Sequence, residues 1–212
     1  MVERNAWRQG PAAIALCAAA GMADAIGYVN SGIFAANMTG NTVLVALALG
    51  SGKWMLASQQ ALCLAMFLIG AMLGRVLLLV GKGRVSVPFL IETALIVACA
   101  VMEGRGFAAT SLIALAMGVQ STAMARFQGV AVSTVVVTSS IARLAEAAVD
   151  RCLGSLRHHV TPSVGTGLYA GGWLAYGVGA LIAGLLARVT DLSLVLPATI
   201  VLGVTALLAQ RS

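Results

Sequence analysis

The chain has 212 residues, of which 60% are hydrophobic and only 9% are charged, whereas soluble domains average about 25% charged residues. This composition argues against a soluble domain and predicts a protein embedded in a membrane. The net charge of +6 does not indicate nucleic-acid binding, because the aromatic residues that stack on bases make up only 5% of the chain. We therefore expect the lipid bilayer as a partner and no nucleic acid.

Eight apolar stretches follow one another along the chain, over residues 12–29, 36–50, 56–80, 85–101, 107–125, 129–149, 167–187 and 192–208. Backbone polar groups stay paired in lipid only in helices and closed barrels, and these continuous apolar runs lack the alternating pattern of barrel strands. The predicted fold class is all-α, a polytopic transmembrane bundle of eight helical segments that makes six to eight crossings. One transmembrane domain, residues 11–212, is expected to follow a cytoplasmic N-terminal tail, residues 1–10.

The second and sixth stretches differ from the others. The second is short and begins with polar residues, and the sixth carries several hydroxyl and charged side chains. Neither is suited to face lipid, so we expect both to be packed inside the bundle or to be re-entrant. With a cytoplasmic N-terminus, eight crossings place 8 of the 13 lysine and arginine residues inside, and six crossings place 10 of them there. Six crossings therefore agree better with the positive-inside rule.

An internal repeat is visible in four pairs of markers that recur in the same order. The pairs are Gly21 and Gly118, Thr39 and Thr138, Gly70 and Gly179, and Pro88 and Pro197. Their offsets are 97, 99, 109 and 109 residues, so the halves, residues 11–105 and 106–212, differ by a longer loop in the second. Duplicated halves are common in transporters, and three crossings in each half make them inverted. Chance similarity between helices rich in alanine, glycine and leucine is the alternative.

Asp24 lies inside the first apolar stretch. A carboxylate there is costly in lipid and must face the bundle interior or water. One interpretation is a functional group that binds a proton or a cation. The other is a structural acid that is satisfied by a polar neighbour such as Asn30 or Asn41, or by an arginine.

The run from Asn37 to Asn41 opens the second stretch with three polar side chains. Gly40 permits a break in the helix, and the side chains of Asn37, Thr39 and Asn41 can bind an ion or a polar solute. In the alternative interpretation, Asn37 or Thr39 caps the second helix. The two interpretations are compatible, because the N-terminus of a helix is itself a site for negative charge.

The sixth stretch carries a polar stripe. Its members recur at spacings that place them on one helical face, and they are Ser139, Arg143, Glu146 and Asp150. Such a stripe lines a cavity in the bundle or forms the wet face of an interfacial helix.

Other residues of the apolar stretches point to packing or to interior contacts. Glu92, Gln120 and Arg126 each need a partner inside the bundle, and Gln120 is a candidate for solute binding. Gly70 and Gly74 form a Gly-x-x-x-Gly pair, which lets two helices approach closely. That pattern serves packing more often than function.

Signatures of enzymes are missing from the sequence. It contains no His-Glu-x-x-His motif, no Gly-x-Ser-x-Gly motif and no Cys/His metal cluster. Cys17, Cys63 and Cys99 lie in apolar stretches and are expected to be small buried residues, whereas Cys152 has charged neighbours and is expected to be accessible. We predict no catalytic residue, no metal ion and no cofactor, and a membrane-embedded enzyme is the least favoured function.

The chain resembles a known family, most specifically over residues 21–41. The residues that carry the resemblance are Gly21, Asp24 and Ala25, then Phe34, Met38, Thr39, Gly40 and Asn41. They resemble the YoaK-like family of small bacterial inner-membrane proteins, a family of unknown function. The resemblance covers most of the chain and implies a multi-pass protein of the bacterial inner membrane with six or seven helices.

The second half fits the family pattern less well. Gly118, Gln120 and Arg126 match it, but Ser121 stands where the family has asparagine, and the run 138–140 replaces a Thr-Gly pair. The resemblance therefore does not imply a polar site on the second side.

Polar residues at corresponding places in two halves favour a small-solute transporter or permease. In this hypothesis Asp24 is the coupling or binding carboxylate, and Asn37, Thr39 and Asn41 line the path of the solute. Further binding candidates are Gln120, Arg143 and Glu146. The alternative is a non-transporting membrane scaffold or assembly factor, in which the same residues serve packing. A bundle of 212 residues is thin around any central pathway, and this favours a homodimer.

Overall fold

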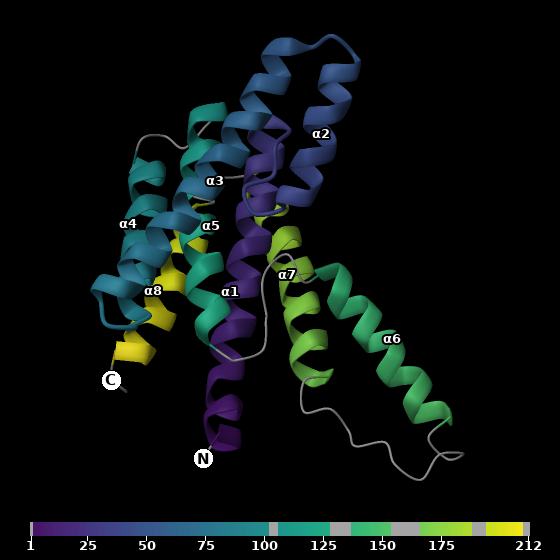
Figure 1. Cartoon of the computed structure of the whole chain (residues 1–212), viewed down its shortest axis with the longest axis vertical. Coiled ribbons are helices and arrows are strands. Elements are labelled where there is room, and N and C mark those ends of the chain that lie inside the picture. Colours follow the sequence, from purple (N-terminus) through teal and green to yellow (C-terminus); the bar gives the residue numbers. More distant parts are fainter. Residues whose placement is uncertain (1, 102–105, 128–136, 154–165, 188–193, 210–212) are drawn as a thin grey trace.

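The computed structural model describes residues 2–101, 106–127, 137–153, 166–187 and 194–209. The described chain is helical apart from short turns, as the composition predicted (Figure 1). The helices are α1 (Val2–Ser31), α2 (Met38–Gly50), α3 (Trp54–Val80), α4 (Ser86–Val101), α5 (Gly106–Phe127), α6 (Val137–Leu153), α7 (Thr166–Leu186) and α8 (Val195–Ala209). The fold is a helical membrane bundle.

Four of these helices are long and apolar enough to cross a membrane: Gly10–Ser31, Trp54–Val80, Gly106–Met124 and Gly167–Leu186. Three shorter apolar helices accompany them: Met38–Gly50, Ser86–Ala100 and Val195–Leu208. The helix in the sixth predicted stretch begins at Val137 in the described residues, and the part predicted over 129–136 lies outside them. Residues 2–10, predicted as an N-terminal tail, belong to α1.

The centre of the bundle is formed by α1 and α5, which are far more buried than α3 and α7. Figure 1 shows α1 and α5 between α4 and α8 on one side and α7 on the other. The two central helices run antiparallel, since Gln120 Nε2 donates to the Leu16 carbonyl over 3.1 Å and Ser31 Oγ donates to Thr110 Oγ1 over 2.9 Å. Alanines such as Ala20 make this close arrangement possible, because they are completely buried without filling much space.

Helices α1 and α7 touch through two glycines. A methyl group added at Gly21 would overlap with the backbone carbonyl of Tyr176, and one added at Gly179 would overlap with the carbonyl of Ala18. Only residues without a Cβ allow two helix backbones to come this close. The glycines therefore set the position of α7 on α1.

Helices α3 and α5 form a second contact of the same kind. A methyl group added at Gly118 would overlap with the carbonyl of Phe67, and one added at Gly70 would overlap with the carbonyl of Leu115. Gly74 extends this contact by one turn, where an added methyl group would meet the Val119 carbonyl at 2.9 Å. The pair of glycines in α3 thus lies against the backbone of α5.

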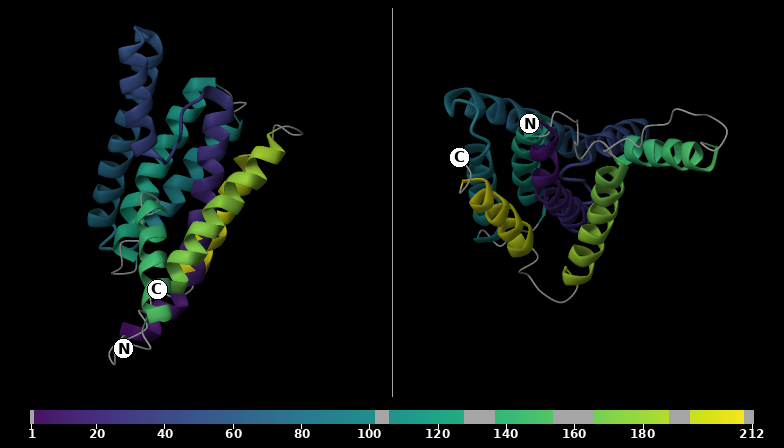
Figure 2. Two further views of the ribbon diagram at one scale, coloured as in Figure 1. Left: turned by 90° about the vertical axis from the view of Figure 1, so that its right-hand side faces the viewer. Right: turned by 90° about the horizontal axis from the view of Figure 1, so that it is seen from below.

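Helices α2 and α6 lie at the periphery, α2 against α3 and α6 against α7. Figure 2 shows α6 projecting away from the central helices. Arg143, Glu146 and Asp150 are exposed, and the Arg143 guanidinium lies over the Tyr169 ring at 5.3 Å from its centroid. The described part of the polar stripe is therefore open to the surroundings, as the interfacial interpretation of α6 requires.

Candidate functional site

The carboxylate of Asp24 lies inside the bundle and binds the segment that joins α1 to α2. Only 3% of this residue is exposed. Oδ1 accepts hydrogen bonds from the backbone N–H groups of Ala36, over 2.5 Å, and Asn37, over 3.0 Å. Oδ2 accepts a hydrogen bond from the Tyr176 hydroxyl. Three donors thus compensate a carboxylate that would otherwise be costly in this place.

The chain leaves α1 at a short turn that brings it back toward Asp24. Gly32 ends the helix with a φ of +69°, a conformation that glycine adopts without strain. Its N–H donates to the Tyr28 carbonyl over 2.8 Å, and the rings of Tyr28 and Phe34 stack with their centroids 4.8 Å apart. Residues 32–37 form the connection between the two helices, called the α1–α2 turn below.

Asn41 holds the α1–α2 turn from the other side. It is completely buried, its Nδ2 donates to the Phe34 carbonyl over 2.6 Å, and its Oδ1 accepts from the Phe34 N–H over 2.9 Å. The Cys63 thiol of α3 donates to the same carbonyl over 3.5 Å. A buried amide side chain can satisfy both backbone groups of Phe34 at once because it is a donor and an acceptor.

The other residues of the 37–41 run have different positions. Asn37 is the N-cap of α2, because its Oδ1 accepts from the Gly40 N–H over 3.0 Å. Gly40 lies close to the Phe34 ring, where a methyl group would meet ring carbons at 3.1 Å. Asn37 and Thr39 are exposed. The capping role expected as one alternative for Asn37 is therefore present in the structure.

The site joins Asp24, Asn37 and Asn41, which sequence reasoning selected, to Tyr176, which it missed. Tyr176 is separated from Asp24 by 152 residues, and no local pattern marks one tyrosine of an apolar helix as the partner of a distant acid. Asn41, named as a candidate partner of Asp24, instead bonds to Phe34.

The remaining predicted binding residues lie elsewhere. Gln120 is buried in α5 and bonds through Nε2 to the Leu16 carbonyl, while its Oε1 has no partner within the described ranges. Arg143 and Glu146 are on the peripheral helix α6. In the described part of the chain, no three His, Cys, Asp or Glu side chains gather closely enough to hold a metal ion.

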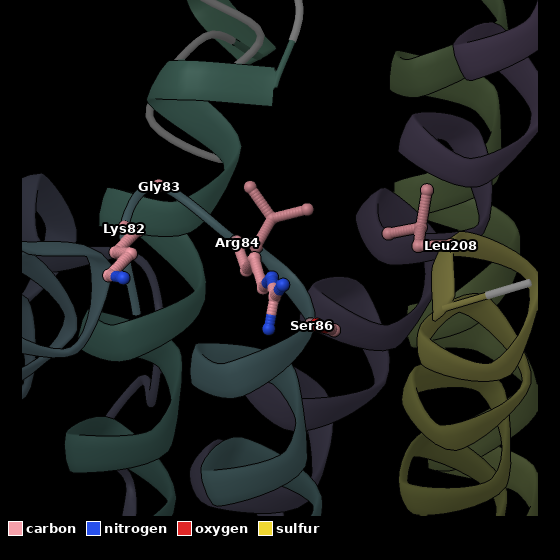
Figure 3. A pocket seen from close by; sticks show the side chains of 6 residues that line it. Lys82, Gly83, Arg84, Ser86 and Leu208 are labelled. Carbon is pink, nitrogen blue, oxygen red and sulfur yellow. The ribbon is translucent and has the colours of Figure 1, made fainter. Parts of the chain in front are cut away.

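A pocket of about 280 Å³ lies at the turn between α3 and α4, on other elements than Asp24. It is lined by the turn, by the start of α4 and by Leu208 of α8, as Figure 3 shows. Lys82 and Arg84 make its rim basic, and Gly83 takes a φ of +83° at the tip of the turn. This position suits a cationic anchor at the membrane surface.

The hydrogen bonds of Asp24 connect three helices. One carboxylate joins α1 to the start of α2 and to α7, and it is the acceptor in the bonds from Ala36, Asn37 and Tyr176. Binding of a proton or a cation to the carboxylate would compete directly with these donors. Neutralisation of Asp24 would therefore weaken its bonds to the α1–α2 turn and to α7.

We expect Asn41→Ala to destabilise the folded protein by about 2–3 kcal/mol, because both backbone groups of Phe34 lose a buried partner. SDS-driven unfolding in mixed micelles measures this difference. Asn37→Asp is the matched control, since aspartate caps a helix as well as asparagine does, and it should change stability by less than about 0.5 kcal/mol. Equal effects of the two substitutions would contradict the role given to Asn41.

Comparisons with known proteins place the chain in a family. Residues 12–208 match the family described as protein of unknown function, DUF1275. The UPF0700 transmembrane protein YoaK of Bacillus subtilis (strain 168) is 32% identical over 145 residues, which cover 62% of this chain and 63% of that relative. The match thus spans less than two thirds of the length of the relative. No solved structure matches significantly. With nearly its whole length matched, the chain belongs to the DUF1275 family and is a multi-pass membrane protein.

Proposed function

We propose that this protein is a small-solute transporter or permease built from two inverted halves, residues 11–105 and 106–212. The support for a duplication is the correspondence between the two glycine contacts. Gly21 and Ala18 of α1 correspond to Gly118 and Leu115 of α5 at an offset of 97 residues. On the partner helices, Phe67 and Gly70 of α3 correspond to Tyr176 and Gly179 of α7 at an offset of 109 residues.

Both glycine contacts between α1 and α7 therefore have an equivalent between α5 and α3. The pairings across the chain also agree, because α4 packs against α5 as α8 packs against α1, and α2 packs against α3 as α6 packs against α7. The antiparallel course of α1 and α5 in Figure 1 is the one that inverted halves require. If α2 and α6 do not cross the membrane, the other six helices make six crossings, which is consistent with this arrangement.

The proposed topology places the N-terminus in the cytoplasm and the protein in the bacterial inner membrane. The start of α1, the end of α8 and the turn between α3 and α4 lie at the same end of the bundle in Figure 1. Lys82 and Arg84 belong to this end. Cytoplasmic segments are enriched in lysine and arginine, which supports the assignment.

The observation that carries the transport proposal is the hydrogen bond from Tyr176 to Asp24. It joins an acid of the first half to a helix of the second half, next to a break between two helices. Inverted-repeat transporters place solute and coupling-ion sites at such breaks between their halves. A proton or solute that binds Asp24 would release the α1–α2 turn and α7 together, and the adjoining Asn37, Thr39 and Asn41 would line the path.

The site is present in one half only. At the corresponding positions the second half has Ser121 in place of Asp24, and the first half has Phe67 in place of Tyr176. The carboxylate and the hydroxyl are thus both missing from the equivalent contact. The proposal therefore gives each chain one site of the Asp24–Tyr176 kind.

Transport is tested with purified protein in liposomes that are challenged with pooled small metabolites and with pH steps. Solute-dependent currents in the wild type and their loss in Asp24→Asn are expected, while tracer uptake covers electroneutral exchange. Asp150→Asn is the matched control, because Asp150 is exposed on α6, and it should keep its current. If no pool produces current or uptake in any protein, the scaffold function is favoured, and capture of a partner protein in mild detergent becomes its test.

A further inference from the structure

Glu92 is an acidic residue of α4 that takes no part in the Asp24 site. It is completely buried, and neither carboxylate oxygen has a hydrogen-bond partner among the residues that the structure describes. Phe89, Ile96 and Cys99 share its helical face by their spacing and are also buried. The acid therefore belongs to the face that packs into the bundle rather than to one that faces lipid.

The elements packed against α4 are α5, α8 and, over a smaller area, α3. Helix α8 contains no ionisable residue between Val195 and Ala209. On α5, the one charged residue is Arg126, whose side chain is outside the described part of the chain. Cys99 of α4 donates to the Ala109 carbonyl, and this antiparallel register sets Glu92 level with about Ala116. Arg126 is ten residues further along α5, or about 15 Å away along the axis.

The other ionisable groups of α3 and α4 are exposed or are hydrogen-bonded to backbone carbonyls. Arg75 of α3 is exposed. Cys63 of α3 donates to the Phe34 carbonyl, and Cys99 donates to the Ala109 carbonyl. Among the described side chains of the neighbouring helices, no cation is thus available to balance a charge on Glu92.

A buried carboxylate without a donor or a cation costs far more than a neutral carboxyl group. Asp24 shows the contrast within the same bundle, because three donors hold its oxygens. Packing does not require the carboxyl group either. At the position 109 residues later, Val201 of α8 is completely buried with an apolar side chain.

We propose that Glu92 is a proton-binding site, which holds a proton while α4 is packed against α5 and α8 and releases it to water only when this contact opens. The reaction transfers the proton from the carboxyl group to a water molecule and leaves a carboxylate. The site does not depend on the transport function. In a transporter that opens between α4 and α8, it would supply a coupling proton in addition to the Asp24 site.

Infrared spectroscopy of the purified protein at neutral pH tests the proposal. The chain has four glutamates, Glu3, Glu92, Glu103 and Glu146. We expect a carbonyl band of a protonated carboxyl that shifts when glutamate is labelled with ¹³C at the side-chain carboxyl, and that is lost in Glu92→Gln. Glu146→Gln, at an exposed position, should leave it unchanged. Absence of a glutamate-dependent band in the folded wild type, or its persistence in Glu92→Gln, would overturn the proposal.

A second measurement follows the unfolding equilibrium in mixed micelles against pH. The folded protein keeps a proton that an exposed glutamate loses above about pH 4.3. The unfolding constant of the wild type relative to Glu92→Gln should therefore rise about tenfold per pH unit above that value. A pH-independent ratio would show that Glu92 is ionised in the folded protein. If Glu92→Gln does not fold, the labelled wild type still decides the question through its spectrum.

Discussion

Asp24→Ala is expected to destabilise the folded protein by about 4 kcal/mol. The substitution leaves the N–H groups of Ala36 and Asn37 and the hydroxyl of Tyr176 without their acceptor inside the bundle. A buried donor that loses a charged acceptor costs about 1–3 kcal/mol, and three donors share this one. Unfolding by SDS in mixed micelles, with hydrogen exchange of the α1–α2 turn, measures the loss.

Two matched variants separate the contributions at this site. Asp24→Asn keeps an oxygen for the two N–H groups and supplies an amide that can donate to the tyrosine oxygen, so it should retain most of the stability. Tyr176→Phe removes only the hydrogen bond from the Tyr176 hydroxyl to Asp24 and should cost about 1–2 kcal/mol. If Asp24→Ala proves no more destabilising than Tyr176→Phe, the carboxylate does not hold the turn.

Gly118→Leu is expected to prevent α5 from packing on α3 and to cost at least about 3 kcal/mol. Even a methyl group at this position would overlap with the carbonyl of Phe67. A backbone atom cannot move aside as the end of a flexible side chain can, so the two helices must separate over the whole contact. The yield of folded protein and its unfolding in mixed micelles provide the measurement.

Gly177→Leu is the control for this substitution. Gly177 of α7 is exposed and has open space where its side chain would be, so an added leucine should face lipid at little cost. Gly21→Leu should be as damaging as Gly118→Leu, because an added Cβ would overlap with the Tyr176 carbonyl in the equivalent contact. A well-folded Gly118→Leu protein would refute the close contact, and unequal effects at the two glycines would weaken the proposed duplication.

The helices could be predicted from the sequence because helix formation in a membrane depends on the composition of each segment. Long apolar runs in lipid leave helices as the main way to pair backbone groups, and the helices occur where these runs do. Asn37 is an example at the scale of one residue, since capping depends on the backbone three residues later. Asp24 could be selected for the same kind of reason, because a carboxylate in an apolar stretch needs compensation wherever the chain goes.

The partners of these residues could not be predicted in the same way, because the contacts join distant parts of the chain. Asn41 and Asn30 were equally good candidates to satisfy Asp24, yet the acid bonds to the backbone of the α1–α2 turn and to Tyr176, 152 residues away. In the part of the chain that the structure describes, Glu92 has no partner, and this depends on which faces of α5 and α8 pack against α4. Helix formation and membrane location thus follow from local composition, whereas the pairing of buried polar groups depends on how the helices pack, since the energy of a buried charge is set by its neighbours in space.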